Sequence, residues 1–130
     1  VDRKFCLKNK LRSVSLKTIL KESDIISLHV PLTKKTFNMI SSKELKIIKK
    51  DCILINTSRG DVINFPELKK SLRKKKIRLA IDVFPTEPLH KDSIFKNDES
   101  IFTPHIGGTT LESKLRIGRK NIQDLKEKFN

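Results

Sequence analysis

The apolar residues of this chain gather in short runs, and a longer, more polar stretch follows each run. The runs occupy residues 25–28, 52–56, 79–83 and 101–103, with a weaker candidate at 11–14. They are nearly all apolar rather than alternating, which is typical of strands covered on both faces. Their starts lie about 22 to 27 residues apart, enough for a strand and a crossover helix. The pattern predicts an α/β fold with a parallel sheet.

The stretches between the runs carry helix signals. Ser15 and Ser42 each precede apolar residues at helical spacing, so each can cap a helix. Asn64 and Pro66 open a third helix, with the proline in the first turn, where its missing N–H costs nothing. From Thr109 onward apolar residues recur every three or four positions, which predicts one long final helix.

Length and composition narrow the class of protein. The 130 residues suffice for one domain, and no apolar run approaches the roughly 20 residues needed to span a bilayer. The start of the chain contains no short apolar stretch of the kind that is typical of a signal peptide. Cys6 and Cys52 belong to no C-x-x-C motif or cysteine–histidine cluster, so we expect reduced thiols and no metal site. These features predict a soluble, cytoplasmic protein.

The net charge of +14 is compatible with a polyanionic partner such as nucleic acid. Of the 29 basic residues 22 are lysines, however, and 16 isoleucines accompany a single alanine, which indicates a genome biased toward A and T. The densest basic run, residues 69–76, falls at the end of a predicted helix, where cations favour the macrodipole. Because tyrosine and tryptophan are absent, few side chains can stack on bases. We therefore expect no nucleic-acid partner, although a nucleic-acid binder stays open as an alternative.

Three polar residues that can act together follow three different runs: Arg59, Glu87 and His105. The carboxyl ends of parallel strands share one edge of a sheet, so these side chains can converge on a ligand there. A guanidinium can bind a carboxylate with two hydrogen bonds, and a carboxylate can orient an imidazole that exchanges a proton near neutral pH. Taken singly, each also fits an ordinary role, as a solvated loop residue, a surface carboxylate or a turn residue.

Other polar residues near the runs are less informative. Asp82 lies inside an apolar run, where a carboxylate is costly unless it is paired, so it is either functional or held by a partner. His29 follows a run and fits a structural or a catalytic role. His90 lies in the irregular stretch 85–100 and is expected to be exposed, although a loop of that length is usually functional. The residues alone predict an α/β domain with a candidate acid/base site.

Four longer strings add to this interpretation. They are Ser-Leu-His-Val-Pro-Leu-Thr at 27–33, Leu-Ile-Asn-Thr-Ser-Arg-Gly at 54–60, Ala-Ile-Asp-Val-Phe-Pro-Thr-Glu-Pro at 80–88 and Thr-Pro-His-Ile-Gly-Gly at 103–108. Together, over about residues 15–118, they resemble the D-isomer-specific 2-hydroxyacid dehydrogenase family in order and spacing. This resemblance implies a Rossmann-like doubly wound sheet, NAD as cofactor and oxidoreductase activity on the CH–OH group of 2-hydroxy acids. The last two strings look closest to the D-3-phosphoglycerate dehydrogenases, which implies a role in serine biosynthesis.

The resemblance also implies a role for each residue that follows a run. Arg59 matches the arginine that binds the substrate's carboxylate and carbonyl, His105 matches the catalytic acid/base, and Glu87 matches its paired carboxylate. Cofactor-binding positions are matched by Asp2, His29, Val30, Pro31, Thr57, Ser58, Asp82, Gly107 and Gly108. Among these, Asp82 matches the residue beside the nicotinamide carboxamide, and Asp2 matches the acidic residue that binds the adenine-side ribose.

The chain departs from the family's pattern in its glycines. They are Gly60, Gly107, Gly108 and Gly118. None belongs to a G-x-G-x-x-G loop, on which the family holds the cofactor's pyrophosphate. The resemblance therefore implies a partial dinucleotide-binding domain at 1–108 that lacks its first βα unit, and a helix at 109–130 that crosses toward a substrate domain. We expect a dehydrogenase fragment, inactive alone, from a homo-oligomer that acts on a small 2-hydroxy or 2-oxo acid. The alternative is a noncatalytic remnant that serves as a binding or assembly module.

Overall fold

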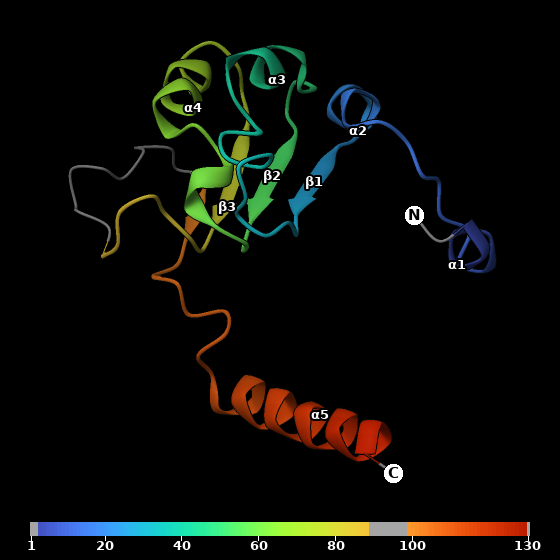
Figure 1. Cartoon of the computed structure of the whole chain (residues 1–130). Coiled ribbons are helices and arrows are strands. Elements are labelled where there is room, and N and C mark those ends of the chain that lie inside the picture. The colour runs from blue at the N-terminus through green and yellow to red at the C-terminus, as the bar shows by residue number, and fades with distance from the viewer. Residues whose placement is uncertain (1–2, 89–98, 130) are drawn as a thin grey trace.

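The computed structural model describes residues 3–88 and 99–129. It contains a four-stranded parallel sheet in which the strands follow one another in chain order (Figure 1). The strands are β1 (Ile25–Leu28), β2 (Ile53–Asn56), β3 (Arg78–Ile81) and β4 (Ile101–Phe102). The predicted α/β class with a parallel sheet is confirmed. Asp2 and His90 lie outside the described residues.

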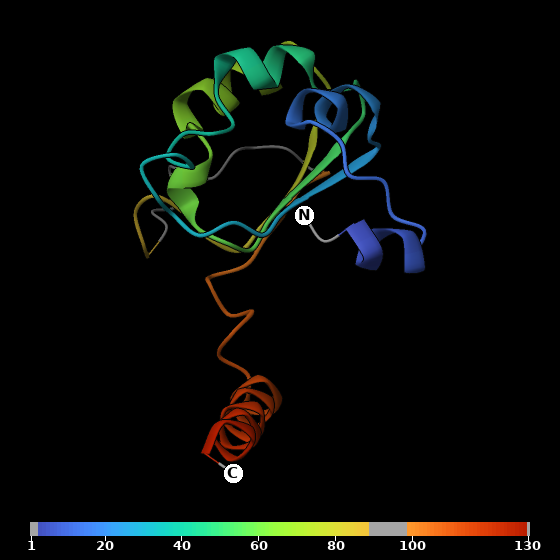
Figure 2. The ribbon, with the colours of Figure 1, turned by 45° about the vertical axis from the view of Figure 1, so that its right-hand side comes forward.

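Three helices cover one face of this sheet (Figure 2). They are α2 (Leu16–Glu22), α3 (Ser42–Ile47) and α4 (Phe65–Leu72), and they bury Leu20, Leu45 and Leu68 respectively. In β1, β2 and β3 every second side chain is buried, and the side chains between them are half-buried or exposed. The prediction that both faces are covered is therefore wrong for the described part of the chain. Because strand side chains alternate, the core lies on the helix side only.

Local capping explains where the helices begin. The hydroxyl of Ser15 accepts a hydrogen bond from the backbone N–H of Thr18 at 3.1 Å, as the sequence predicts for α2. The side chain of Asn64 likewise accepts from the N–H of Glu67 at 3.1 Å, and a proline in the first turn completes the predicted start of α4. For α3 the predicted cap is wrong by one residue. The cap is Ser41, because Glu44 is then placed to accept from its backbone N–H at 3.2 Å.

Two further expectations need correction at the start of the chain. Residues 11–15 form no strand, and Leu11 and Val14 are exposed, since no neighbouring strand is available to pair with them among the described residues. A short helix, α1 (Arg3–Lys8), precedes them and was not anticipated from the sequence. β1 is consequently an edge of the described sheet, and the side chain of Ile25 on it is exposed.

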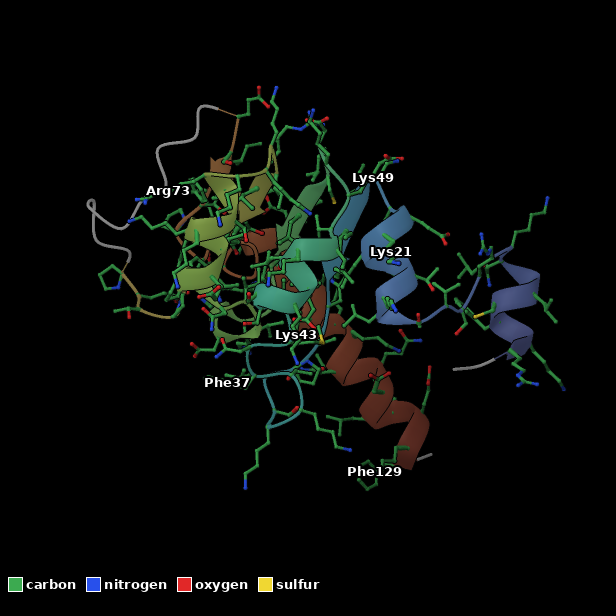
Figure 3. All side chains as sticks on the ribbon, turned by 90° about the horizontal axis from the view of Figure 1, so that it is seen from above. Lys21, Phe37, Lys43, Lys49, Arg73 and Phe129 are labelled. Carbon is green, nitrogen blue, oxygen red and sulfur yellow. The ribbon has the colours of Figure 1, made fainter. Side chains whose placement is uncertain are left out.

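The predicted final helix is present as α5 (Leu111–Phe129). None of its 19 residues, all of which the structure describes, is buried. Figure 1 shows the helix standing apart from the sheet, and in Figure 3 Phe129 lies at its far end. The apolar stripe that predicts this helix is therefore exposed along its whole length.

The basic residues lie mainly on the outer surface of the molecule. Lys21, Lys43 and Arg73 are exposed on the helix-covered side (Figure 3). In the basic run 69–76, Lys75 reaches a different helix from the one that precedes it. Its Nζ donates to the carbonyl oxygens of Leu45, Lys46 and Ile48 at the C-terminal end of α3. The ammonium group of Lys75 thus donates to carbonyl groups at the C-terminal end of α3, rather than to those of α4, the helix that precedes it in the sequence.

Candidate active site

The four strands end side by side at the carboxyl edge of the sheet. The pairing register aligns Leu28 of β1 with Asn56 of β2, Asn56 with Ile81 of β3, and Ile81 with Phe102 of β4. The residues that follow directly are His29, Thr57, Asp82 and Thr103. Every described residue with a predicted role lies within six positions of one of these strand ends. The sheet therefore brings segments together that are up to 79 residues apart in the sequence.

Glu87 and His105 form a direct pair at this edge. The Nδ1 atom of His105 lies 2.7 Å from Oε2 of Glu87, and the backbone N–H of Phe84 donates to Oε1 at 2.9 Å. The hydrogen bond from His105 and that from Phe84 lower the pKa of Glu87 below its usual range. An ionised carboxylate can only accept, so Nδ1 carries the hydrogen and Nε2 is left to exchange a proton. Both side chains are partly exposed and thus within reach of a ligand.

Asp82 is buried at the end of β3, with 6% of its surface exposed. Its Oδ1 accepts from the hydroxyl of Thr103 at 2.5 Å and from the N–H of Ile106 at 2.9 Å, and its Oδ2 accepts from the N–H of Gly107 at 3.0 Å. Burial by itself would raise the pKa of Asp82, but the hydrogen bonds outweigh it and the pKa is lowered. Asp82 therefore stays ionised and links β3 to the loop that carries His105.

Arg59 lies on the turn that follows β2. The buried side chain of Asn56 shapes this turn, because it donates to the carbonyl of Arg59 at 3.0 Å and accepts from the N–H and hydroxyl of Ser58. The guanidinium of Arg59 is exposed and donates to the carbonyl of Ser58 at 2.6 Å. Next to it, Gly60 presses against the backbone of residues 84–85, where any added Cβ would overlap the main chain. The turn of Arg59 thus packs directly on the segment that leads to Glu87.

The remaining residues with predicted cofactor roles line the same edge. His29 is exposed, and its Nε2 lies 2.8 Å from the hydroxyl of Ser27. The carbonyl of Pro31 accepts from the hydroxyl of Thr36 at 2.6 Å. Val30 is half-buried, Thr57 is exposed, and a Cβ added to Gly108 would meet nothing within 4 Å.

Two residues of this edge were not singled out from the sequence. Asn56 is fully buried and Thr103 holds Asp82. An asparagine that ends an apolar strand two positions before a serine is a detectable turn signal. The bond of Thr103 spans 21 positions and has no local signature. Beside it lies an apolar hollow of about 290 Å³, lined by Phe84, Glu87, Pro88, Phe102, Thr103, Pro104 and His105.

Residues 3–88 and 99–129 offer neither a metal cluster nor a membrane span. No three histidine, cysteine, aspartate or glutamate side chains of this part gather closely enough to hold a metal ion. None of its helices combines the length and the apolar character that crossing a membrane requires. Cys52 is buried, Cys6 is half-buried, and both are free thiols.

Comparison with known proteins agrees with this geometry. Residues 2–107 match the family described as D-isomer specific 2-hydroxyacid dehydrogenase, NAD binding domain. Glyoxylate reductase from Thermococcus litoralis is 50% identical over 102 residues, which cover 78% of this chain and 31% of that protein. D-3-phosphoglycerate dehydrogenase from Escherichia coli is 40% identical over 124 residues, which cover 91% of this chain and 30% of that protein. The chain thus spans about a third of the length of these relatives.

A solved structure supports the same assignment. D-lactate dehydrogenase from Aquifex aeolicus, crystallised with NAD and lactic acid, superposes with a TM-score of 0.79 at 34% identity, over 97% of this chain and 43% of that one. The fold is therefore of the Rossmann type, the class that binds dinucleotides at the carboxyl edge of its sheet. The chain belongs to the D-isomer-specific 2-hydroxyacid dehydrogenase family and corresponds to its NAD-binding domain.

Proposed function

We propose that this chain provides the NAD-binding and proton-transfer part of an oxidoreductase that interconverts D-2-hydroxy acids and 2-oxo acids. The observation that carries the proposal is the Glu87–His105 pair, 2.7 Å apart at the aligned ends of the strands. A carboxylate that fixes the tautomer of a partly exposed histidine is the arrangement needed for general acid–base catalysis. When bound, NAD supplies the redox chemistry by accepting or returning a hydride.

His105 moves the proton in this proposal. With Nδ1–H held by Glu87, its neutral Nε2 takes the hydroxyl proton as a hydroxy acid is oxidised, and the imidazolium returns that proton when a 2-oxo acid is reduced. Glu87 is ionised and stabilises the imidazolium in both directions. Arg59 binds the substrate's carboxylate, since its exposed guanidinium is held in the described part of the chain by a single bond, to the carbonyl of Ser58.

Several groups suit the nicotinamide end of the cofactor. Among the described residues, Oδ2 of Asp82 accepts the hydrogen bond of Gly107 alone, and a carboxylate oxygen can accept a second one from a carboxamide N–H. In this proposal the cofactor also contacts the other residues with predicted cofactor roles along the same edge of the sheet: His29, Val30, Pro31, Thr57, Ser58, Gly107 and Gly108. In this proposal residues 1–108 form the dinucleotide-binding part, and residues 109–130 form the crossing to a substrate-binding part.

The substrate itself is a narrower question. The strings around Asp82 and His105 favour D-3-phosphoglycerate, and thereby serine biosynthesis, and the match over 91% of the chain to a D-3-phosphoglycerate dehydrogenase supports this. Glyoxylate is the second candidate, because the match to a glyoxylate reductase reaches 50% identity. Both are small acids with a carboxylate for Arg59 to bind.

The test measures NADH absorbance with the 130-residue chain and, in parallel, with the complete reading frame that contains it. Assays with 3-phosphoglycerate and NAD, and with glyoxylate and NADH, identify the substrate. We expect His105→Gln to lower kcat by about a hundredfold or more. Arg59→Ala should raise KM for the acid, whereas the matched control Arg73→Ala, at the C-cap of α4, should change neither constant. Turnover that survives His105→Gln unchanged would contradict the proposal.

A second function is favoured by the exposure of α5, whose apolar residues are covered by none of the described residues. In that case the chain is a noncatalytic module that associates with another polypeptide. It would bind NAD or a partner without turnover in either assay. Sedimentation of the chain tests for self-association through α5, and association without turnover in either assay distinguishes this second function from the first.

A further inference from the structure

Asp82 accepts hydrogen bonds from residues that lie on both sides of His105 in the sequence. Thr103, two positions before the histidine, donates its hydroxyl to Oδ1 at 2.5 Å. Ile106 and Gly107, the two positions after it, donate their backbone N–H groups to Oδ1 and Oδ2 at 2.9 and 3.0 Å. One buried carboxylate thus fixes three points of a five-residue segment whose central residue is His105.

The backbone of this segment needs such support. His105 has a φ of 55°, in the left-handed region that costs a residue with a Cβ about 1 kcal/mol. A Cβ added at Gly107 would approach Oδ2 of Asp82 to 3.0 Å, so the absence of a side chain allows the N–H to come close. On the other side, the N–H of Phe84 fixes Glu87 independently of Asp82. The orientation of His105 toward Glu87 therefore depends on the loop.

We propose that Thr103 and Asp82 are positioning residues, which hold His105 in its left-handed conformation so that Nδ1 faces Glu87. The catalytic part of this inference rests on the proposed function, whereas the geometric part does not. Thr103 is needed because a carboxylate offers only acceptors, so each fixed point must supply a donor. In an Asp82→Asn variant, the side-chain amide would turn its own N–H₂ group toward one of these donors. The lowered pKa of Asp82 agrees with a carboxylate that stays ionised in this role.

The test of the geometric part uses the carboxyl resonance of Glu87 in the 130-residue chain. The pKa of Glu87 is lowered chiefly by the hydrogen bond from His105, with smaller contributions from Phe84 and His105 charge, opposed by burial and by Asp82. Thr103→Val removes the hydroxyl at nearly constant volume. We expect the pKa of Glu87 to rise part of the way to its ordinary value, because the loop relaxes and the imidazole moves away while the bond from Phe84 remains.

Matched variants separate positioning from general destabilisation. Thr103→Ser keeps a hydroxyl and should retain the lowered pKa. Thr109→Val removes a hydroxyl bonded to the carbonyl of Ile106 on the far side of the same loop, and should leave Glu87 unchanged. Should Thr103→Val fail to fold, Asp82→Asn replaces it with amide exchange as the readout, because loss of the Asp82 charge by itself lowers the pKa of Glu87. Exchange at Ile106 and Gly107 should then be faster than in the wild type. A folded Thr103→Val chain with the wild-type Glu87 titration, or an Asp82→Asn chain with wild-type exchange at both amides, overturns the proposal.

The catalytic part is read from the complete reading frame. Thr103→Val should lower kcat by about tenfold to a hundredfold with little change in KM for NADH, and Thr103→Ser should restore it. If the Glu87 titration moves but no variant shows turnover, the positioning role of Thr103 and Asp82 stands and the proposed function fails. If His105→Gln abolishes turnover while Thr103→Val leaves both the Glu87 titration and kcat unchanged, the proposed function stands and the positioning role fails.

Discussion

The helix-covered side of the sheet and α5 use the same kinds of apolar residue at similar helical spacing. On the first, Leu45 of α3 and Leu68 of α4 are 0% exposed. On the second, Leu115 and Leu125 are 51% and 56% exposed. A stripe of leucines thus specifies that a helix presents an apolar face, but not what covers that face. Among the described residues the buried core and the candidate site belong to the sheet, its covering helices and the loops at its edge, and no residue of α5 is buried.

Gly60→Ala should break the helix-covered region most severely. The added Cβ would overlap the backbone of Phe84 and Pro85, which cannot move without shifting Glu87. We expect a loss of about 4 kcal/mol or more in the free energy of unfolding, seen in urea denaturation followed by circular dichroism. Gly108→Ala is the control, since its Cβ would point into open space. A Gly60→Ala chain as stable as the wild type would show that these segments do not pack as described.

Leu54→Ala should be the next largest effect. Leu54 is 0% exposed at the centre of β2, so its truncation leaves a cavity beneath the helices. The expected loss is about 3 kcal/mol in the free energy of unfolding, measured by the same denaturation. A loss below about 1 kcal/mol would mean that the core is more loosely packed than the burial of its residues indicates.

Acid should lower the free energy of unfolding through Asp82 and Glu87, at the carboxyl edge of the sheet. Asp82 and Glu87 both have pKa values below their ordinary 3.8 and 4.5, so each contributes stability that is complete above the ordinary value and is lost as pH falls through the lowered one. Asp82→Asn should cost about 2 kcal/mol near pH 7 through its charged hydrogen bonds. This difference from the wild type should shrink progressively below pH 3.8, as thermal denaturation over a pH series can show. A difference independent of pH would argue against an ionised Asp82.

Lys75→Met should have a smaller effect within the same region. The substitution keeps the apolar stem but removes the charge that three carbonyls at the end of α3 accept from. We expect a loss of about 1 kcal/mol by thermal denaturation. Lys74→Met, at the exposed neighbouring position, should lie within about 0.5 kcal/mol of the wild type. Equal losses from the two variants would mean that the capping role is absent.

Leu115→Ala sharpens the comparison by repeating the Leu54→Ala change on α5. Because Leu115 contacts solvent over half its surface, the free energy of unfolding of this chain should change by no more than about 0.5 kcal/mol. Urea denaturation of the two alanine variants side by side measures the contrast. A loss comparable to that of Leu54→Ala would show that α5 packs on the chain in solution.

Prediction from the sequence succeeded best where the cause is local. The caps Ser15 and Asn64 act within three residues of their own positions, and the apolar runs place all four strands to within one or two residues. It was wrong where the outcome depends on distant neighbours. The run at 11–14 has the residues of a strand but no pairing partner among the described residues. The cap predicted at Ser42 was wrong for a local reason instead, since Glu44 accepts from the backbone N–H of Ser41 and makes that residue the cap.

The candidate site divides in the same way. The strings that contain Arg59, Glu87 and His105 predict the chemistry without coordinates, because these residue types follow strand ends at the family's spacing. Glu87 and His105 are in contact, as their predicted pairing requires, while the catalytic and cofactor roles of all the site residues stay predictions. The support of His105 by Asp82 and Thr103 joins positions 21 to 25 residues apart, and only the pairing of β3 with β4 brings them together.

The sequence by itself therefore determined the order of the elements from α2 onward, the caps of α2 and α4, and which titratable side chains follow the strand ends. The tertiary structure alone decided which faces are covered, which hydrogen bonds hold Asp82 and that α5 is exposed. The reason is physical: caps and periodicity depend on neighbours a few residues away, whereas burial and polar satisfaction depend on strands that meet only after the sheet has formed.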